Sequence, residues 1–309
     1  MSLSSQEILQ KYGTSPQALI RKGMEAEVYA LDENTFLKLY VGTIDPVYLV
    51  TLRDFYNSLD RSVLSYALPE IKSIDVEGDV CITVERKLPG APMSVLLSTY
   101  CKKQMDDAMC AVLAAVLELN RFSLPLHQDR YKLFDGEGLS LRSEGDWHQF
   151  LARFLRRKLI ELESHLEREV MDFHGKSECL FSILELPYIG DYRLVHGDFF
   201  PGNILVDGNF RITALLDFGL LTMYGDPLFD IATGWVFFDM YDVLKVNIRE
   251  RYLSIILEML GERVRGILYR YVLLYSFLSA NTYSPACSDD HYQWCVANLN
   301  DQEYWNKIE

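Results

Sequence analysis

The sequence predicts an α+β protein of two lobes, a small antiparallel sheet followed by a mostly helical region. Residues 18–85 contain short runs of β-branched and aromatic residues separated by turn residues. From Met93 onward, helical periods dominate instead. The proline- and glycine-containing segment 88–92 lies between the two regions. We therefore expect an N-terminal lobe of residues 1–87 and a helical C-terminal lobe of residues 88–309.

Composition narrows the class of protein. The chain has 309 residues, 49% of them hydrophobic, with 44 acidic against 30 basic side chains and a net charge of −14. This charge opposes nucleic-acid binding, so we expect no nucleic-acid partner. The N-terminus lacks the apolar stretch of a signal peptide, and the apolar run 271–280 is shorter than the ~20 residues of a membrane span. We expect a cytoplasmic protein with no membrane partner.

The first lobe is expected to contain five strands and one helix. Residues 18–40 predict three short antiparallel strands, broken near Lys22 and at the turn 32–34. A helical segment follows at 46–59, and two further strand candidates lie at 71–76 and 80–85.

The second lobe is expected to be built on long helices. Apolar residues recur at helical spacing within 103–120, which predicts a central helix with one buried face. A polar loop at 128–145 precedes a predicted helix at 146–173, and the chain after Asp226 is predicted to be almost wholly helical. The six cysteines have no metal-ligand spacing, so we expect reduced, mostly buried thiols.

One stretch carries a chemically meaningful spacing. HGDFFPGN at 196–203 is followed by DFG, which begins at Asp217. A hairpin turn at 207–209 would return the chain so that Asp217 lies near Asn203. A carboxylate and an amide at one point suit Mg²⁺, which takes few protein ligands and completes its shell with water and phosphate oxygens. Asp198 would face that metal and accept a hydroxyl proton.

These motifs resemble those of the aminoglycoside phosphotransferase and choline kinase group of the protein-kinase-like fold. In this chain Gly197 stands where protein kinases usually have arginine. GDPLFD at 225–230 is similar to that group's next conserved segment. The resemblance implies an ATP- and Mg-dependent phosphotransferase that transfers the γ-phosphate to a hydroxyl of a small molecule. It implies Asp198 as the catalytic residue, Asn203 and Asp217 as metal ligands, and His196 and Asp230 as structural braces of the loop.

The same resemblance assigns nucleotide-binding residues in the first lobe. Lys38, on the third predicted strand, would hold the α- and β-phosphates. Gly23 belongs to a phosphate-covering loop that has few of the usual glycines. The hinge that receives adenine through backbone groups would comprise Glu85, Arg86 and Lys87.

Two features leave alternatives open. Kinases place a glutamate on the helix after the lysine, but residues 48–53 contain no acid, so Asp45, Asp54 or a carboxylate from elsewhere would have to pair with Lys38. This absence and the glycine-poor loop at Gly23 are the support for a catalytically inactive nucleotide-binding module. The loop beginning at Gly23 is similar to Gly-x-Glu-Ala loops of some atypical protein kinases, but the helical insertion before Leu194 would occupy space that a peptide needs.

The acceptor is expected to be a cationic, hydroxyl-bearing small molecule, an amino-sugar of the aminoglycoside kind or an amino-alcohol. The family resemblance implies this, and the net charge favours attraction of a cation. Trp235, Phe238, Asp239 and Asp242 share one helical face that could form an amine pocket, although a packed face explains the pattern better. Other acids expected near the cleft are Glu161, Glu163, Asp289 and Asp290.

Overall fold

A computed structural model describes residues 4–22, 26–41, 44–125, 145–219, 221–238, 240 and 247–308. The chain forms two compact units. Unit 1 contains residues 1–93 and 203–217, and unit 2 contains residues 94–202 and 218–309. This division differs from the expected lobe boundary after Lys87 because the hairpin at 203–217 pairs with residues that follow the first sheet.

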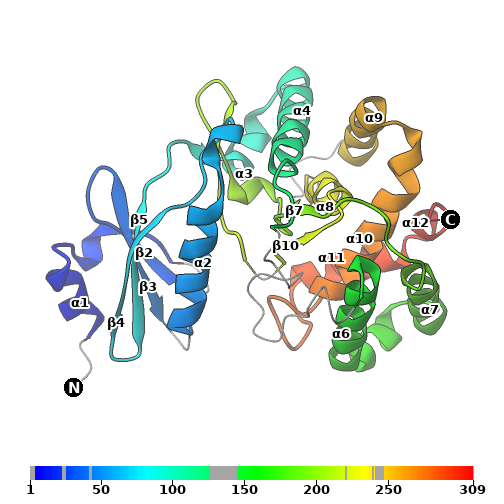
Figure 1. Ribbon diagram of the computed structural model, residues 1–309, viewed down its shortest axis with the longest axis horizontal. Helices are drawn as coiled ribbons and strands as arrows, with labels where there is room; N and C mark the ends of the chain where they lie inside the picture. Colours follow the sequence, from blue (N-terminus) through cyan, green and yellow to red (C-terminus); the bar gives the residue numbers. More distant parts are fainter. Residues whose placement is uncertain are drawn as a thin grey trace. The chain divides into compact units, whose positions relative to one another are not determined.

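Unit 1 contains the five-stranded antiparallel sheet that the sequence predicts, in the order β1-β2-β3-β5-β4. Helix α2 lies beside the sheet (Figure 1). The hairpin strands β8 and β9 form a second sheet with β6, in the order β6-β8-β9. The elements of unit 1 are β1 (Leu19–Lys22), β2 (Ala26–Ala30), β3 (Thr35–Val41), β4 (Ile71–Glu77), β5 (Val80–Arg86), β6 (Ala91–Pro92), β8 (Ile204–Val206), β9 (Ile212–Leu215), α1 (Ser5–Lys11) and α2 (Pro46–Ser58).

Alternation along β3 decides what each face of the sheet contacts. Leu37 and Leu39 are fully buried on one face, in a cluster with Ile8 and Leu9 of α1. Lys38 and Tyr40 alternate with them, and Tyr40 packs with Leu49 of α2. Figure 1 shows the two helices on opposite sides of the strands. Helix α1 is not among the predicted elements, although Ser4 and Glu7 form a capping box, a recognisable start signal.

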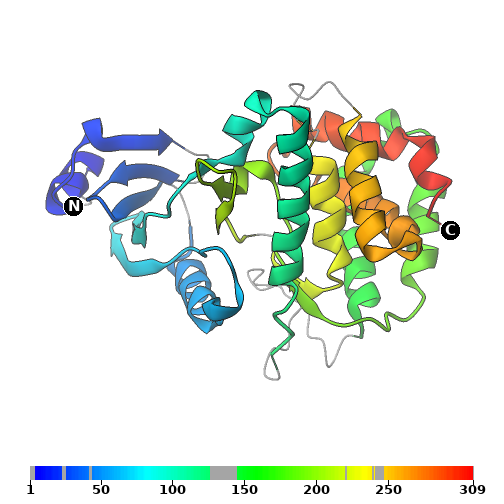
Figure 2. The same ribbon diagram turned by 90° about the horizontal axis from the view of Figure 1, so that it is seen from above.

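Unit 2 is mostly helical, and α10 lies at its centre. Most of α10 is buried, and it packs against α6, α8, α11 and α12. Figure 2 shows α4 alongside α8 and α9. The elements are α3 (Met93–Leu96), α4 (Lys102–Leu119), α6 (Trp147–Glu169), α7 (Phe173–Leu184), α8 (Leu228–Phe237), α9 (Ile248–Leu260), α10 (Arg265–Ser279), α11 (Asp290–Asn300), α12 (Gln302–Trp305), β7 (Arg193–Val195) and β10 (Met223–Gly225). Short 3₁₀ turns cover Pro16–Ala18, Arg61–Val63, Leu97–Thr99, Pro201–Asn203 and Glu262–Val264.

The long helix predicted at 146–173 is wrong at its end. Helix α6 ends at Glu169, and Asp172 adopts a left-handed conformation with φ 52° before α7 begins. A non-glycine residue in that conformation interrupts helical hydrogen bonding, and the sequence offered no glycine or proline to mark the break. The helix predicted at 103–120 is confirmed as α4, but α10 and not α4 lies at the centre of unit 2.

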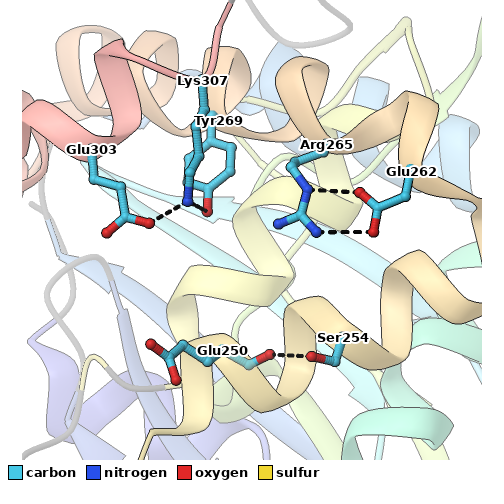
Figure 3. A network of polar contacts seen from close by, with 7 residues as sticks. All are labelled: Glu250, Ser254, Glu262, Arg265, Tyr269, Glu303 and Lys307. Carbon is cyan, nitrogen blue, oxygen red and sulfur yellow. Dashed lines mark hydrogen bonds and ion pairs between the residues drawn. The ribbon is translucent and has the colours of Figure 1, made fainter.

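The end of the chain is attached to α10 through polar contacts (Figure 3). Lys307 bonds Glu303 and lies 3.5 Å from the Tyr269 hydroxyl of α10. Arg265 makes two parallel hydrogen bonds, 2.8 and 3.0 Å, to Glu262. These side chains are partly or largely exposed, so each pair contributes little to stability.

Two expectations concern cysteines and membranes. All six cysteines are free, but only Cys81, Cys287 and Cys295 are buried, so the expectation of mostly buried thiols is wrong for the other half.

Among the described residues, no helix has both the length and the apolarity to cross a bilayer.

Candidate active site

The loop after β7 carries the predicted catalytic residue, and its backbone is tightly constrained. Gly197 has φ +82°, and a Cβ atom there would lie 2.2 Å from the carbonyl oxygen of Leu221. No side chain fits this position without moving the backbone. The structure thus gives a physical reason for a glycine between His196 and Asp198.

Asp230 on α8 holds this loop. Its carboxylate accepts the backbone N–H of His196 at 2.6 Å and that of Gly197 at 2.8 Å. The side chain is fully buried, and burial raises the pKa of Asp230 to about 7, although the two N–H donors act in the opposite direction. Thr222 adds a hydrogen bond of 2.9 Å from its hydroxyl to the carbonyl oxygen of His196.

His196 is buried within the loop and packs on the aromatic residue of the DFG segment. Its ring centroid lies 4.4 Å from that of Phe218 and 5.7 Å from that of Phe199. Its Nδ1 accepts the backbone N–H of Asp198 at 3.2 Å. Through these contacts the imidazole of His196 helps to set the conformation of the loop that carries Asp198. We call His196, Gly197, Asp198 and Asp230 the loop set.

The predicted metal ligands lie at one end of the β8–β9 hairpin. The carbonyl oxygen of Asn203 accepts the N–H of Leu216 at 2.8 Å, which brings Asn203 and Asp217 to the same end. The hairpin prediction is therefore confirmed. Asp217 has φ 56°, a left-handed conformation that is rare for a non-glycine residue and is often found at functional sites.

The chemistry of these two residues fits Mg²⁺. Among the described residues, no donor hydrogen-bonds the exposed carboxylate of Asp217, so its oxygens are available to a cation. Asn203 is buried at 8% exposure and supplies an amide oxygen. Two oxygen ligands match a cation that usually retains several waters.

Lys38 pairs with a carboxylate from the neighbouring strand. Its Nζ lies 3.2 Å from Oε2 of Glu85, and the hydroxyl of Thr83 donates to the other oxygen of Glu85 at 2.8 Å. Burial opposes the charge of Lys38, but nearby Glu85 and Asp217 outweigh it and hold the pKa of Lys38 above its usual range. We call Lys38, Glu85, Asn203 and Asp217 the lysine set, and all four belong to unit 1.

The two acids first considered as partners of Lys38 have other roles. Asp45 is the N-cap of α2 and accepts the N–H of Val47 at 2.8 Å. Asp54 is exposed and bonds the guanidinium of Arg53. The sequence predicts Glu85 only as a hinge residue. The register between β3 and β5 would have identified Glu85 as the partner of Lys38. Lys38 lies opposite Thr83, and Thr83 and Glu85, two residues apart, share a face of the sheet.

The structure describes the other predicted hinge residues but not the phosphate-covering loop. The backbone N–H of Arg86 donates to Glu70 at 2.9 Å, and that of Lys87 donates to Asn34 at 2.7 Å. Both donors therefore have intramolecular acceptors. Adenine recognition by residues 85–87 stays a prediction, and Gly23 lies outside the described residues.

A row of aromatic rings extends from the catalytic loop to α11. Phe200 contacts Phe237 at 6.0 Å, and Phe237 contacts Trp294 at 5.9 Å between ring centroids. Trp294 stacks on His291 at 5.8 Å, and His291 contacts the half-exposed Tyr283 at 5.0 Å. We call Phe200, Phe237, Tyr283, His291 and Trp294 the aromatic row.

Polar atoms without partners lie at the α11 end of this row. Among the described residues, Nδ1 of His291, Nε1 of Trp294 and Oδ2 of Asp289 are buried with no hydrogen-bond partner. Burial lowers the pKa of His291, so its ring is neutral near pH 7. Buried polar atoms are usually satisfied, and a cluster of unsatisfied ones points to a ligand or to water.

The other acceptor-side predictions have mixed outcomes. Trp235 and Phe238 are buried, and Nε1 of Trp235 donates to the carbonyl oxygen of Arg249 at 2.8 Å, which fits a packed helix face. Asp239 and Asp242 lie outside the described residues. Glu161 bonds Lys158 and Asn281, while Glu163 and Asp290 are exposed.

Comparison with known proteins agrees with this fold. The sequence matches the phosphotransferase enzyme family over residues 19–265. No individually curated protein matches it. Solved structures with the same fold include the gentamicin complex of APH(2″)-IIa, with TM-score 0.63, 16% identity and 100% of both chains covered. Another is the GDP and kanamycin complex of APH(2″)-IIIa, with TM-score 0.62, 15% identity and coverage of 93% and 92%.

A third similar structure is APH(3″)-Id from Streptomyces rimosus with ADP and streptomycin. Its TM-score is 0.60 at 14% identity, and the match covers 88% of this chain and 97% of that one. The fold and these structural neighbours define a bilobal α+β protein of the protein-kinase-like class. Because the family match covers most of the chain, this protein belongs to the phosphotransferase enzyme family.

Proposed function

We propose that this protein transfers the γ-phosphate of ATP to a hydroxyl of a cationic small molecule, in the presence of Mg²⁺. The observation that carries the proposal is the lysine set, in which unit 1 holds a charged lysine and the exposed carboxylate of Asp217, to which no described residue donates a hydrogen bond. Cationic and metal-binding groups of this kind bind the phosphates in kinases.

Each residue has a distinct role in the proposed reaction. Lys38 binds the α- and β-phosphates, and Asn203 and Asp217 would hold Mg²⁺, which neutralises charge on the β- and γ-phosphate oxygens when bound. Asp198 orients the acceptor hydroxyl and takes its proton as the oxygen attacks the γ-phosphorus. The bond to the bridging oxygen breaks, and ADP leaves. Residues 199–202 connect Asp198 to Asn203 in the chain.

The lysine set also bears on the alternative that the chain is a catalytically inactive nucleotide-binding module. Its support was the glycine-poor loop at Gly23 together with the absence of an acid on the helix after Lys38. Glu85 supplies a carboxylate to Lys38 from β5, so this absence does not favour an inactive module.

A cationic acceptor is supported by the aromatic row. Aromatic faces attract cations, and Asp289 offers a carboxylate oxygen that has no hydrogen-bond partner among the described residues. A neutral His291 does not repel a positive charge. Tyr275 links this region to the catalytic residue, because it contacts both His291 and Trp294 and its pKa, raised mainly by burial, also responds to the charge of Asp198. An amino-sugar or an amino-alcohol has the required cation and hydroxyl.

The direct test is a nucleotide-consumption screen of the purified protein. The panel contains amino-sugars, amino-alcohols, neutral sugars and a peptide mixture, each with ATP and in parallel with GTP, with and without Mg²⁺. We expect Mg²⁺-dependent turnover with ATP and at least one cationic acceptor. Turnover with the peptides alone would contradict the proposal and favour an atypical protein kinase.

A further inference from the structure

The burial and contacts of the Glu85 side chain are those of a residue that holds Lys38 in place. Its side chain is 5% exposed, and that of Lys38 is 23% exposed. One carboxylate oxygen contacts Nζ of Lys38 at 3.2 Å, while the other accepts the Thr83 hydroxyl at 2.8 Å. Both oxygens are therefore engaged, and the carboxylate is fixed in orientation.

The strands fix the position of this pair. Lys38 on β3 lies opposite Thr83 on β5, and Phe36 lies opposite Glu85. The lysine and the glutamate are thus diagonal neighbours on one face of the sheet, a separation that long side chains can bridge. The Lys38 ammonium also lies 5.6 Å from the centroid of the Phe36 ring, so it is confined on a second side.

We propose that Glu85 is the positioning residue for Lys38, and that this chain orients its nucleotide-binding lysine through a neighbouring strand instead of helix α2. The assignment rests on the proposed function. The side chain of Glu85 acts through Lys38, because its two carboxylate oxygens are already engaged by Lys38 and Thr83. A buried carboxylate that lost its cation would be left uncompensated, so each partner fixes the other.

Calorimetric titration with MgATP tests this through a double-mutant cycle of Glu85→Gln, Lys38→Met and the double variant. We expect Glu85→Gln to weaken MgATP binding by ~10-fold or more, because a misplaced ammonium loses its phosphate contacts. In the Lys38→Met background the same substitution should change the affinity by less than ~2-fold. A structural role alone would produce the loss in both backgrounds.

Two further variants sharpen the result. Glu85→Asp keeps the charge but shortens its reach, so its affinity should fall between those of wild type and Glu85→Gln, and it replaces Glu85→Gln if that variant does not fold. Asp54→Asn is the matched control, because it removes an exposed acid of α2 that pairs with Arg53, and it should bind like the wild type.

The outcomes separate the two proposals. Wild-type affinity in both Glu85 variants, or an equal loss with and without Lys38, would overturn the positioning role while leaving the phosphotransferase proposal intact. A wild-type protein that binds neither MgATP nor MgGTP would overturn the proposed function, and the positioning role with it.

Discussion

The backbone N–H of His196 donates to the carboxylate of Asp230 across 2.6 Å, although 34 residues separate them in the chain. Asp230 is fully buried and also accepts the N–H of Gly197. One side chain of α8 therefore sets the course of the backbone immediately before the proposed catalytic residue. The raised pKa of that side chain links the stability of the fold to pH.

Replacing Asp230 by Asn should change how stability depends on pH. Because burial raises the pKa of Asp230 to about 7, the folded protein retains a proton that the unfolded chain releases above about pH 4. The contribution of this group to stability therefore falls as pH rises from about 4 to about 7. Between pH 5.5 and 7.0 the wild type should lose up to about 2 kcal/mol of unfolding free energy relative to Asp230→Asn.

Urea unfolding of both proteins across this pH range measures the difference. Asp230→Asn also lacks one of the two acceptor oxygens, which costs about 1–3 kcal/mol at every pH. A gap between the two proteins that stays constant with pH would contradict the raised pKa of Asp230.

Asp198→Asn should lower turnover by ~10²-fold or more while leaving ATP affinity nearly unchanged. The substitution removes the group that accepts the acceptor's proton but leaves the lysine set intact. Steady-state kinetics with the acceptor found in the screen, beside calorimetry with MgATP, separates the two effects. Near-wild-type turnover in this variant would refute the assignment.

Asp217→Ala should abolish the Mg²⁺-dependent part of thermal stabilisation by ATP, because the triphosphate needs a metal to neutralise its charge. Asn203→Ala should reduce it less, since an amide oxygen carries no net charge. Melting temperatures are compared with ATP alone and with ATP plus Mg²⁺. Equal shifts in the wild type and in Asp217→Ala would show that the metal binds elsewhere.

Gly197→Ala should destabilise the protein by about 1–3 kcal/mol and impair turnover, because a methyl group collides with the backbone of Leu221 at a left-handed φ. Gly208→Ala is a matched control, because the turn position is exposed and a Cβ there meets no atom within 4 Å. Thermal unfolding and activity of both variants are measured together. Equal behaviour of the two would contradict steric exclusion at Gly197.

For the acceptor, kcat/KM should fall as ionic strength rises if it is cationic. An acidic protein attracts a cation over a distance that shrinks from ~30 Å at 0.01 M salt to ~8 Å at 0.15 M. The KM for ATP should respond differently, because ATP is an anion. Flat salt dependence, or preference for a neutral sugar, would reject a cationic acceptor but not the phosphotransferase.

Local sequence patterns predicted what depends on local chemistry. The five strands, the hairpin at Asn203 and helix α4 all followed from periodicity and turn residues. The partner of Lys38 did not, because a cross-strand pair depends on register between β3 and β5, which no single segment encodes. The break before Asp172 was missed for a related reason, since Asn300, distant in sequence, hydrogen-bonds the backbone of Glu169 and Met171 where local propensity favoured continuation.

The pairing of Lys38 with β5 has a consequence for inhibition. A compound that displaces α2 would leave the ammonium where it is, because both members of the ion pair belong to hydrogen-bonded neighbouring strands. Kinase inhibitors that act by displacing the helix equivalent to α2 should therefore not inhibit this protein. Effective antagonists would have to compete for the lysine itself.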